Sequence, residues 1–132
     1  MNFKALSLAA IAATYALAVP ASAHHSFAMF DAAKDVTLKG TVKEFEWTNP
    51  HSWLRVMVTD EKTGKPVLWA LELSSPARLT TMGMHRDTVK AGDVVSVTFH
   101  PMKDGTRGGQ FMSAALPGGK NIIRAEAKDE NQ

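Results

Sequence analysis

The histidines are the residues of this chain with the clearest capacity for chemistry, because the sequence contains no cysteine. His24 and His25 are adjacent, whereas His51 and His100 each stand beside a proline. If the mature chain begins at His24, the free α-amine and the imidazole of that residue can chelate one metal ion, and His25 adds a further nitrogen. Nitrogen ligands suit copper and zinc, and copper(II) stands near the top of the affinity order. The alternative is a histidine pair that is merely exposed beside a cleavage site.

A turn rich in aromatic residues surrounds His51. Its sequence is Trp47-Thr48-Asn49-Pro50-His51-Ser52-Trp53. Trp47, Asn49 and Trp53 are candidates to bind a small ligand or a protein partner by ring stacking and hydrogen bonding. In the alternative interpretation, both indole rings pack against the N-terminal segment. His51 is the preferred metal ligand outside the N-terminus, and His100 is a reserve, because the sequence does not place these two side chains together.

The acidic residues give little support for catalysis. Glu44, Glu46 and Glu72 lie on expected strands, and Glu72 is flanked by apolar residues. Glu72 therefore either faces solvent or is held by a basic partner, and we include it among the candidate ligand-binding residues. Nothing in the sequence fixes the spacing of a carboxylate pair for acid–base chemistry. The chain has no Gly-x-Ser-x-Gly, no His-Glu-x-x-His and no phosphate-binding loop, so we predict no catalytic residues and no enzyme.

Methionine supplies the only sulfur ligands of a chain without cysteine. The methionines are scattered, and the one compact group that includes a histidine is Met82-Gly83-Met84-His85. We expect Met82 and Met112 to fill the core, because methionine adapts to irregular gaps in apolar interiors. We expect His85 to lie on the surface.

Residues 1–23 have the pattern of a secretory signal peptide. Lys4 supplies the positive charge, an apolar run extends from Leu6 to Val19, and Ala21-Ser22-Ala23 is a small-x-small cleavage pattern. The apolar run is shorter than the roughly 20 residues that cross a bilayer, so no membrane anchor is expected in the mature chain. Residues 24–132 would then be a single exported domain, either periplasmic or secreted.

Composition excludes some partners. The formal net charge is only +2, and acidic and basic residues are mixed along the chain, which argues against a nucleic-acid partner. A chain without cysteine forms no disulfide, so its stability depends on its apolar core.

Alternating apolar and polar residues predict an all-β fold. The expected strands cover residues 36–47, 52–59, 67–73, 94–100, 110–116 and 121–123. Ser75 and Pro76 begin a short helix that ends near Gly83. A helix between the third and fourth strands is the order of a small OB-like barrel of five or six strands, with a β-sandwich as the alternative. A change of phase after Glu44 indicates a bulge, and the charged tail from Arg124 is expected to fray.

Several short motifs occur in a characteristic order. They are His24-His25-Ser26, Phe30-Asp31, Asn49-Pro50-His51, Trp69 with Glu72, Ser75-Pro76, Gly92-Asp93, His100-Pro101 and Asp104-Gly105. Together they resemble a family of small exported bacterial proteins known only as a domain of unknown function. The resemblance implies an exported protein without an assigned activity. Two hypotheses follow: a binding protein for copper or zinc, or a structural module that binds a protein partner or small ligand at its aromatic turn.

Overall fold

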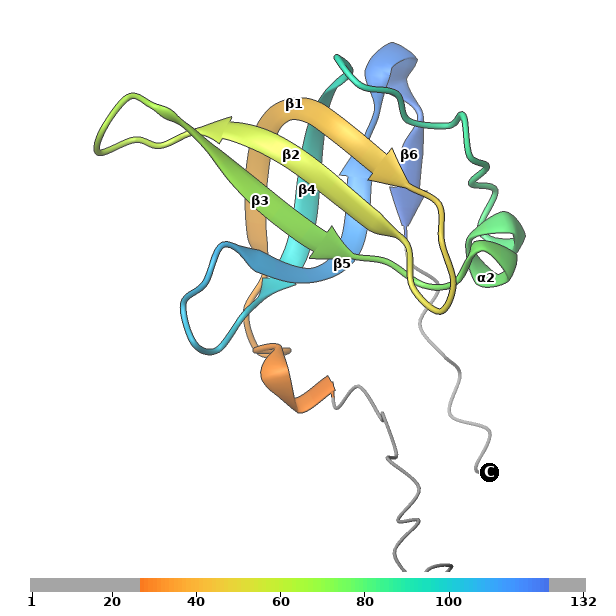
Figure 1. The fold of residues 1–132 in the computed structure, drawn as a ribbon, viewed down its shortest axis with the longest axis horizontal. Helices are drawn as coiled ribbons and strands as arrows, with labels where there is room; N and C mark the ends of the chain where they lie inside the picture. Colours follow the sequence, from red (N-terminus) through yellow and green to blue (C-terminus); the bar gives the residue numbers. More distant parts are fainter. Residues whose placement is uncertain (1–26, 124–132) are drawn as a thin grey trace, which may run out of the picture.

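Strand β1 (Val36–Glu46) organises the barrel, because it pairs with a different neighbour along each half of its length. The computed structural model describes residues 27–123, and in it the first half of β1 pairs with β4 (Val94–Pro101). The second half pairs with β2 (Trp53–Thr59), and both pairings are antiparallel (Figure 1). The register shifts between Val42 and Glu44, close to the bulge that the sequence predicts after Glu44.

The other strands close the barrel. Strand β2 pairs with β3 (Pro66–Glu72), and the end of β3 pairs in parallel with the start of β5 (Gly108–Ala115). Strand β5 also pairs with β4, which completes a ring of five strands. The short strand β6 (Asn121–Ile123) adds to the second half of β5, outside that ring. The expected small barrel of five or six strands is confirmed: five strands close it and β6 adds a sixth.

The barrel interior is filled by apolar side chains. The buried cluster comprises Val42, Leu54, Val56, Val58, Leu71, Leu73, Leu79, Met84, Val89, Val95, Val97, Phe99, Phe111, Ala114, Leu116 and Ile122. Phe99 and Phe111 are the largest of the side chains that are fully buried. The burial of Met84 in this cluster separates it from any metal-binding role, whereas Met82 packs against the cluster as expected.

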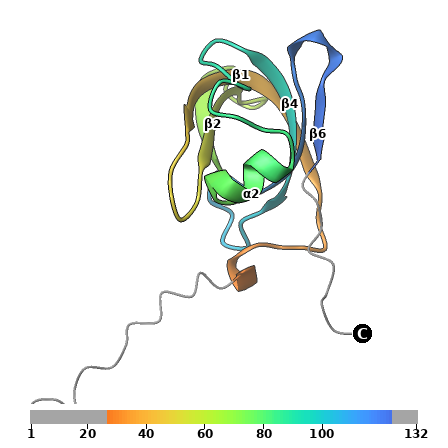
Figure 2. The ribbon, with the colours of Figure 1, turned by 90° about the vertical axis from the view of Figure 1, so that its right-hand side faces the viewer.

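Helix α2 (Pro76–Thr81) lies between β3 and β4 in the chain and crosses one end of the barrel (Figure 2). The hydroxyl oxygen of Ser75 accepts a hydrogen bond from the backbone N–H of Arg78 at 3.4 Å, so the expected N-cap is confirmed. The chain leaves the helix through Gly83, at φ +79°, a conformation that glycine adopts without steric cost. Leu79 is the residue that the helix buries in the core.

Some boundaries and turns differ from expectation. Strand β5 begins at Gly108 rather than Gln110, because its two glycines already pair with β3 and β4. The 3-10 turn η2 (Phe27–Met29) was not expected, whereas η3 (Pro117–Gly119) lies at the turn that precedes the predicted last strand. The proposed signal peptide, His24, His25 and the charged tail lie outside the described residues. None of the helices in the described part has the length and apolar character needed to cross a membrane.

Candidate functional site

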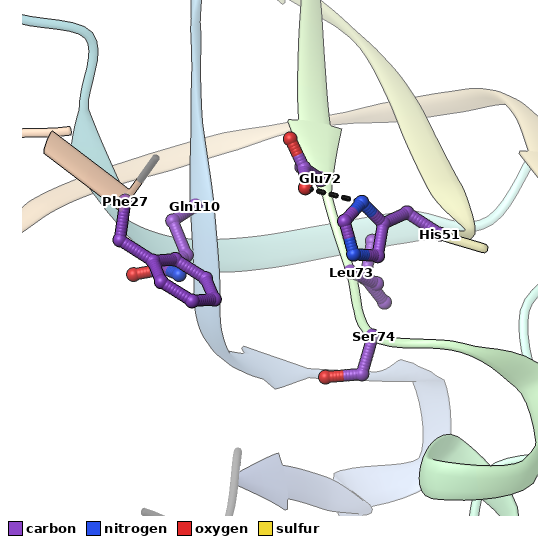
Figure 3. A pocket seen from close by; sticks show the side chains of 6 residues that line it. All are labelled: Phe27, His51, Glu72, Leu73, Ser74 and Gln110. Carbon is purple, nitrogen blue, oxygen red and sulfur yellow. Dashed lines mark ion pairs between the residues drawn. The ribbon is translucent and has the colours of Figure 1, made fainter. Parts of the chain in front are cut away.

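An ion pair between His51 and Glu72 lies at the centre of the candidate site. Nδ1 of His51 is 2.6 Å from Oε1 of Glu72 (Figure 3). Glu72 ends strand β3 and is only 8% exposed. In the strand register it stands opposite Trp53 of β2 and Gln110 of β5. Glu72 is thus held by a basic partner, and the alternative in which it faces solvent is wrong.

The backbone of the turn holds His51 over the end of β3. The N–H of Leu73 donates to the carbonyl oxygen of Ser52 at 2.9 Å, and the N–H of Ser52 donates to the carbonyl oxygen of Ser74 at 3.1 Å. The Thr48 hydroxyl donates to the carbonyl oxygen of His51 at 2.9 Å. The two backbone hydrogen bonds and the burial of Ser52 tie the turn to the end of β3.

The ion pair fixes the chemical form of the imidazole. An ionised carboxylate only accepts hydrogen bonds, so Nδ1 of His51 carries the proton that it donates to Glu72. When the ring is neutral, Nε2 then has the lone pair with which imidazole binds transition metals. Histidines that bind metals commonly donate their other ring N–H to a carboxylate in this way. The pair therefore has the arrangement of a metal-binding histidine and its supporting carboxylate.

Three hollows adjoin the pair. The histidine hollow, of about 40 Å³, is lined by Phe27, His51, Glu72, Leu73, Ser74 and Gln110. The methionine hollow, of about 270 Å³, is lined mainly by Met29, Phe30, Trp53, Ala70, Glu72 and Met102. The turn hollow, of about 200 Å³, is lined by Glu46, Thr48, Asn49, Pro50, His51, Trp53 and Arg55. His51 lines both the histidine and the turn hollow, Glu72 both the histidine and the methionine hollow, and Trp53 both the turn and the methionine hollow. Each pair of hollows therefore shares one lining residue.

The three hollows differ in chemistry. Figure 3 shows Phe27 and Gln110 on one side of the histidine hollow and the His51–Glu72 pair on the other. Its volume suits an ion or water rather than an organic molecule. The turn hollow is polar, and in it Arg55 forms an ion pair with Glu46 and lies 3.4 Å from Glu44. The positive charge of Arg55 is thus shared between these two carboxylates.

The remaining candidate residues are spread over the surface. Asn49 lines the turn hollow, whereas the Trp47 ring packs edge-on against Phe45, with ring centroids 5.6 Å apart. Trp47 also packs on the core and does not line the three hollows. The alternative in which both indole rings pack on the N-terminal segment is wrong for Trp47, whereas Trp53 lines the methionine hollow together with Phe30 of that segment.

His100 is held by a different carboxylate. Its Nε2 lies 3.3 Å from Oδ1 of Asp35, and its buried Nδ1 has no hydrogen-bond partner among the described residues. In the register His100 stands opposite Gln110, which stands opposite Glu72. The register therefore places His100 two strands away from Glu72, and His100 does not line any of the three hollows. Residues 27–123 contain no group of three or more His, Cys, Asp and Glu side chains able to hold a metal.

Several residues of the hollows escaped sequence reasoning as site residues, among them Phe27, Met29, Met102 and Gln110. Phe27 carried a partial signal, because an aromatic residue near a mature terminus is available to pin that segment onto the barrel. Met29, Met102 and Gln110 carried none, since their positions depend on how distant segments meet when the barrel closes.

We expect His51→Ala to lower the free energy of unfolding by about 1–2 kcal/mol, because it leaves the buried Glu72 carboxylate without its partner. Glu72→Gln in the His51→Ala background should recover part of this loss, since it removes the unpaired charge. Urea unfolding of both single variants and the double variant measures the coupling, with His85→Ala as an exposed control. Additive losses would contradict an energetic link between the two side chains.

Comparison with known proteins assigns the chain to a family through its sequence. A family model described as a family of unknown function (DUF6152) matches residues 12–112, which is most of the chain. No curated protein and no solved structure shows significant similarity to the chain.

Proposed function

The chain belongs to the DUF6152 family of unknown function, and we propose that it is an exported, non-enzymatic binding protein for a divalent transition metal, copper in preference to zinc. The proposed ligands are His24, His25 and His51. One observation carries the proposal: the His51–Glu72 pair lines a hollow that Phe27 also lines, and Phe27 follows the two N-terminal histidines closely.

Chain length makes the three histidines compatible with one site. Consecutive Cα atoms lie about 3.8 Å apart, so the Cα atom of His25 stands within about 7.6 Å of that of Phe27. By the same argument the Cα atom of His24 stands within about 11 Å. A histidine side chain adds several ångströms to either distance. Both imidazoles and the α-amine of a chain starting at His24 therefore have the reach to meet Nε2 of His51.

The donor set favours copper over zinc. An α-amine and three imidazoles supply nitrogen alone, and copper(II) binds such ligands more tightly than the other divalent ions of its row. Glu72 would not bind the metal itself but would orient His51. Protons compete with the metal for all of these donors, so affinity should fall as the pH is lowered.

The proposal is tested by calorimetric titration of the mature chain with Cu(II) and with Zn(II), its first residue confirmed by mass spectrometry. We expect stoichiometric Cu(II) binding that weakens about 100-fold in His24→Ala or after acetylation of the α-amine, because the chelate is lost. Glu72→Gln should weaken binding about 10-fold or more through His51. His85→Ala is the matched histidine control and should change nothing.

A synthetic peptide of residues 24–30 separates the folded site from the terminal histidines. The mature chain should bind Cu(II) more tightly than this peptide, because only the chain supplies His51. Equal affinities, or binding that ignores His51→Ala, would contradict the proposed ligand set.

The turn hollow favours one alternative function, an interaction module that binds a protein partner or small ligand. Asn49 and Trp53 line this hollow together, and they combine an amide with a large aromatic face, as ligand sites commonly do. Chelators distinguish the two functions: a partner held at the turn stays bound in their presence, whereas binding that depends on a metal is lost.

A further inference from the structure

Two methionines from opposite ends of the domain, Met29 and Met102, line one hollow beside Trp53 and Glu72. We propose that this methionine hollow binds a soft monovalent metal ion, Cu(I), through the thioether sulfurs of Met29 and Met102. The proposal goes beyond the divalent nitrogen site proposed above and does not depend on it, because the ligands, the hollow and the charge of the ion all differ.

Backbone contacts hold the two methionines close together. Phe30 and Met102 form an isolated antiparallel bridge. The N–H of Lys103 donates to the carbonyl oxygen of Met29 at 3.0 Å, and the N–H of Asp31 donates to that of Pro101 at 2.8 Å. The segment that carries Met29 is therefore fixed along the segment that carries Met102, at the lower end of the barrel in Figure 1. Fixing the two backbone segments in advance reduces the entropy that their side chains lose when they bind an ion.

The hairpin after β4 leaves room for the Met102 side chain. A Cβ atom on Gly108 would lie 3.4 Å from Cγ of Met102 and 3.1 Å from the carbonyl oxygen of Ala70. The Met102 side chain therefore packs against Gly108, where no side chain occupies the space. The Asp104 carboxylate shapes this hairpin by accepting hydrogen bonds from the N–H and the hydroxyl of Thr106 at 3.0 and 2.7 Å. These bonds hold the turn of the hairpin that follows Met102.

The chemistry of the hollow suits a soft cation. Thioethers prefer Cu(I) to hard ions, and the ring face of Trp53 attracts cations. The Glu72 carboxylate and the Arg107 guanidinium both line this hollow, and the positive charge of Arg107 is offset by Asp60, 3.8 Å away. Met29 is 40% exposed, which leaves a route from solvent. Met84, in contrast, is enclosed in the core at 1% exposed.

Silver(I) is the probe, because it shares the charge and softness of Cu(I) and is not oxidised by air. The full mature chain is titrated with silver nitrate in chloride-free buffer, and binding is followed by calorimetry and by Trp fluorescence. We expect stoichiometric binding that weakens at least about 30-fold in the Met29→Leu/Met102→Leu double variant. Met57→Leu, on the same outer face of the barrel, is the matched control and should stay within about twofold. Replacing methionine by leucine conserves volume, so the fold should be kept.

A second pair of measurements separates this site from the nitrogen site. Acetylation of the N-terminal amine should abolish tight Cu(II) binding and leave Ag(I) binding unchanged. The Met29→Leu/Met102→Leu double variant should lose tight Ag(I) binding and keep Cu(II) binding unchanged. Ag(I) affinity that is unaffected by the double variant, or that follows acetylation instead, would overturn the thioether site without touching the Cu(II) result.

Discussion

Phe99→Ala is expected to lower the free energy of unfolding by about 3–5 kcal/mol, the range for losing a buried aromatic ring. Phe99 is fully buried on β4 and stands opposite Phe111 of β5 in the register. Its ring lies 5.4 Å from the ring of Trp69, measured between centroids. The cavity would thus open between three strands that cannot all collapse inward. Urea unfolding followed by Trp fluorescence measures the loss.

Phe99→Leu is the matched control, because leucine fills much of the same space without the aromatic contact. It should cost clearly less than the alanine variant, at about 1–2 kcal/mol. Small domains are stable by only about 5–15 kcal/mol, so the alanine variant is measured at low temperature, where it still has a folded baseline. A loss below about 1 kcal/mol would contradict the central place given to this ring.

Gly109→Ala is expected to lower the free energy of unfolding by about 3 kcal/mol, through overpacking rather than through a cavity. A Cβ atom at Gly109 would lie 2.4 Å from Cδ2 of Phe99 and 2.5 Å from the carbonyl oxygen of His100. The second of these is a backbone atom, so relief requires β4 and β5 to move apart. Gly109 also stands opposite Leu71 of β3, which places the strain where the barrel closes. Thermal and urea unfolding measure it.

The neighbouring glycine gives the control for this prediction. In Gly108→Ala the new Cβ meets its nearest atom, the carbonyl oxygen of Ala70, at 3.1 Å, which a small shift relieves. We expect a loss of about 1 kcal/mol or less. Equal losses in the two variants would show that the close approach at Gly109 does not control stability.

The strands and the helix were accessible to sequence reasoning because their signals are local. Alternation along β1 and β2 follows from one face being buried, and the cap formed by Ser75 and Pro76 depends on adjacent residues alone. The start of β5 was missed at Gly108 because two glycines show no alternation. Its pairing with β3 is visible only once the barrel is closed.

The candidate site was less accessible, because it depends on contacts between distant residues. His51 and Glu72 were separate candidates, and their spacing along the chain does not reveal that the turn folds back onto the end of β3. Met29 and Met102 come from segments that meet only through the bridge at Phe30. The one compact group of methionines in the sequence, around Met84, instead contributes to the core.

The isolated bridge between Phe30 and Met102 also bears on the order of folding. The meander of β1, β2 and β3 pairs neighbours in sequence, and loops of that size close at little entropic cost. The His51–Glu72 pair belongs to this meander and can form with it. The segment around Met29 must wait for a hairpin near the other end of the domain, and such non-local pairing is slow. We therefore expect refolding to form the His51–Glu72 pair first, and the histidine and methionine hollows, both of which the N-terminal segment lines, in a later kinetic phase.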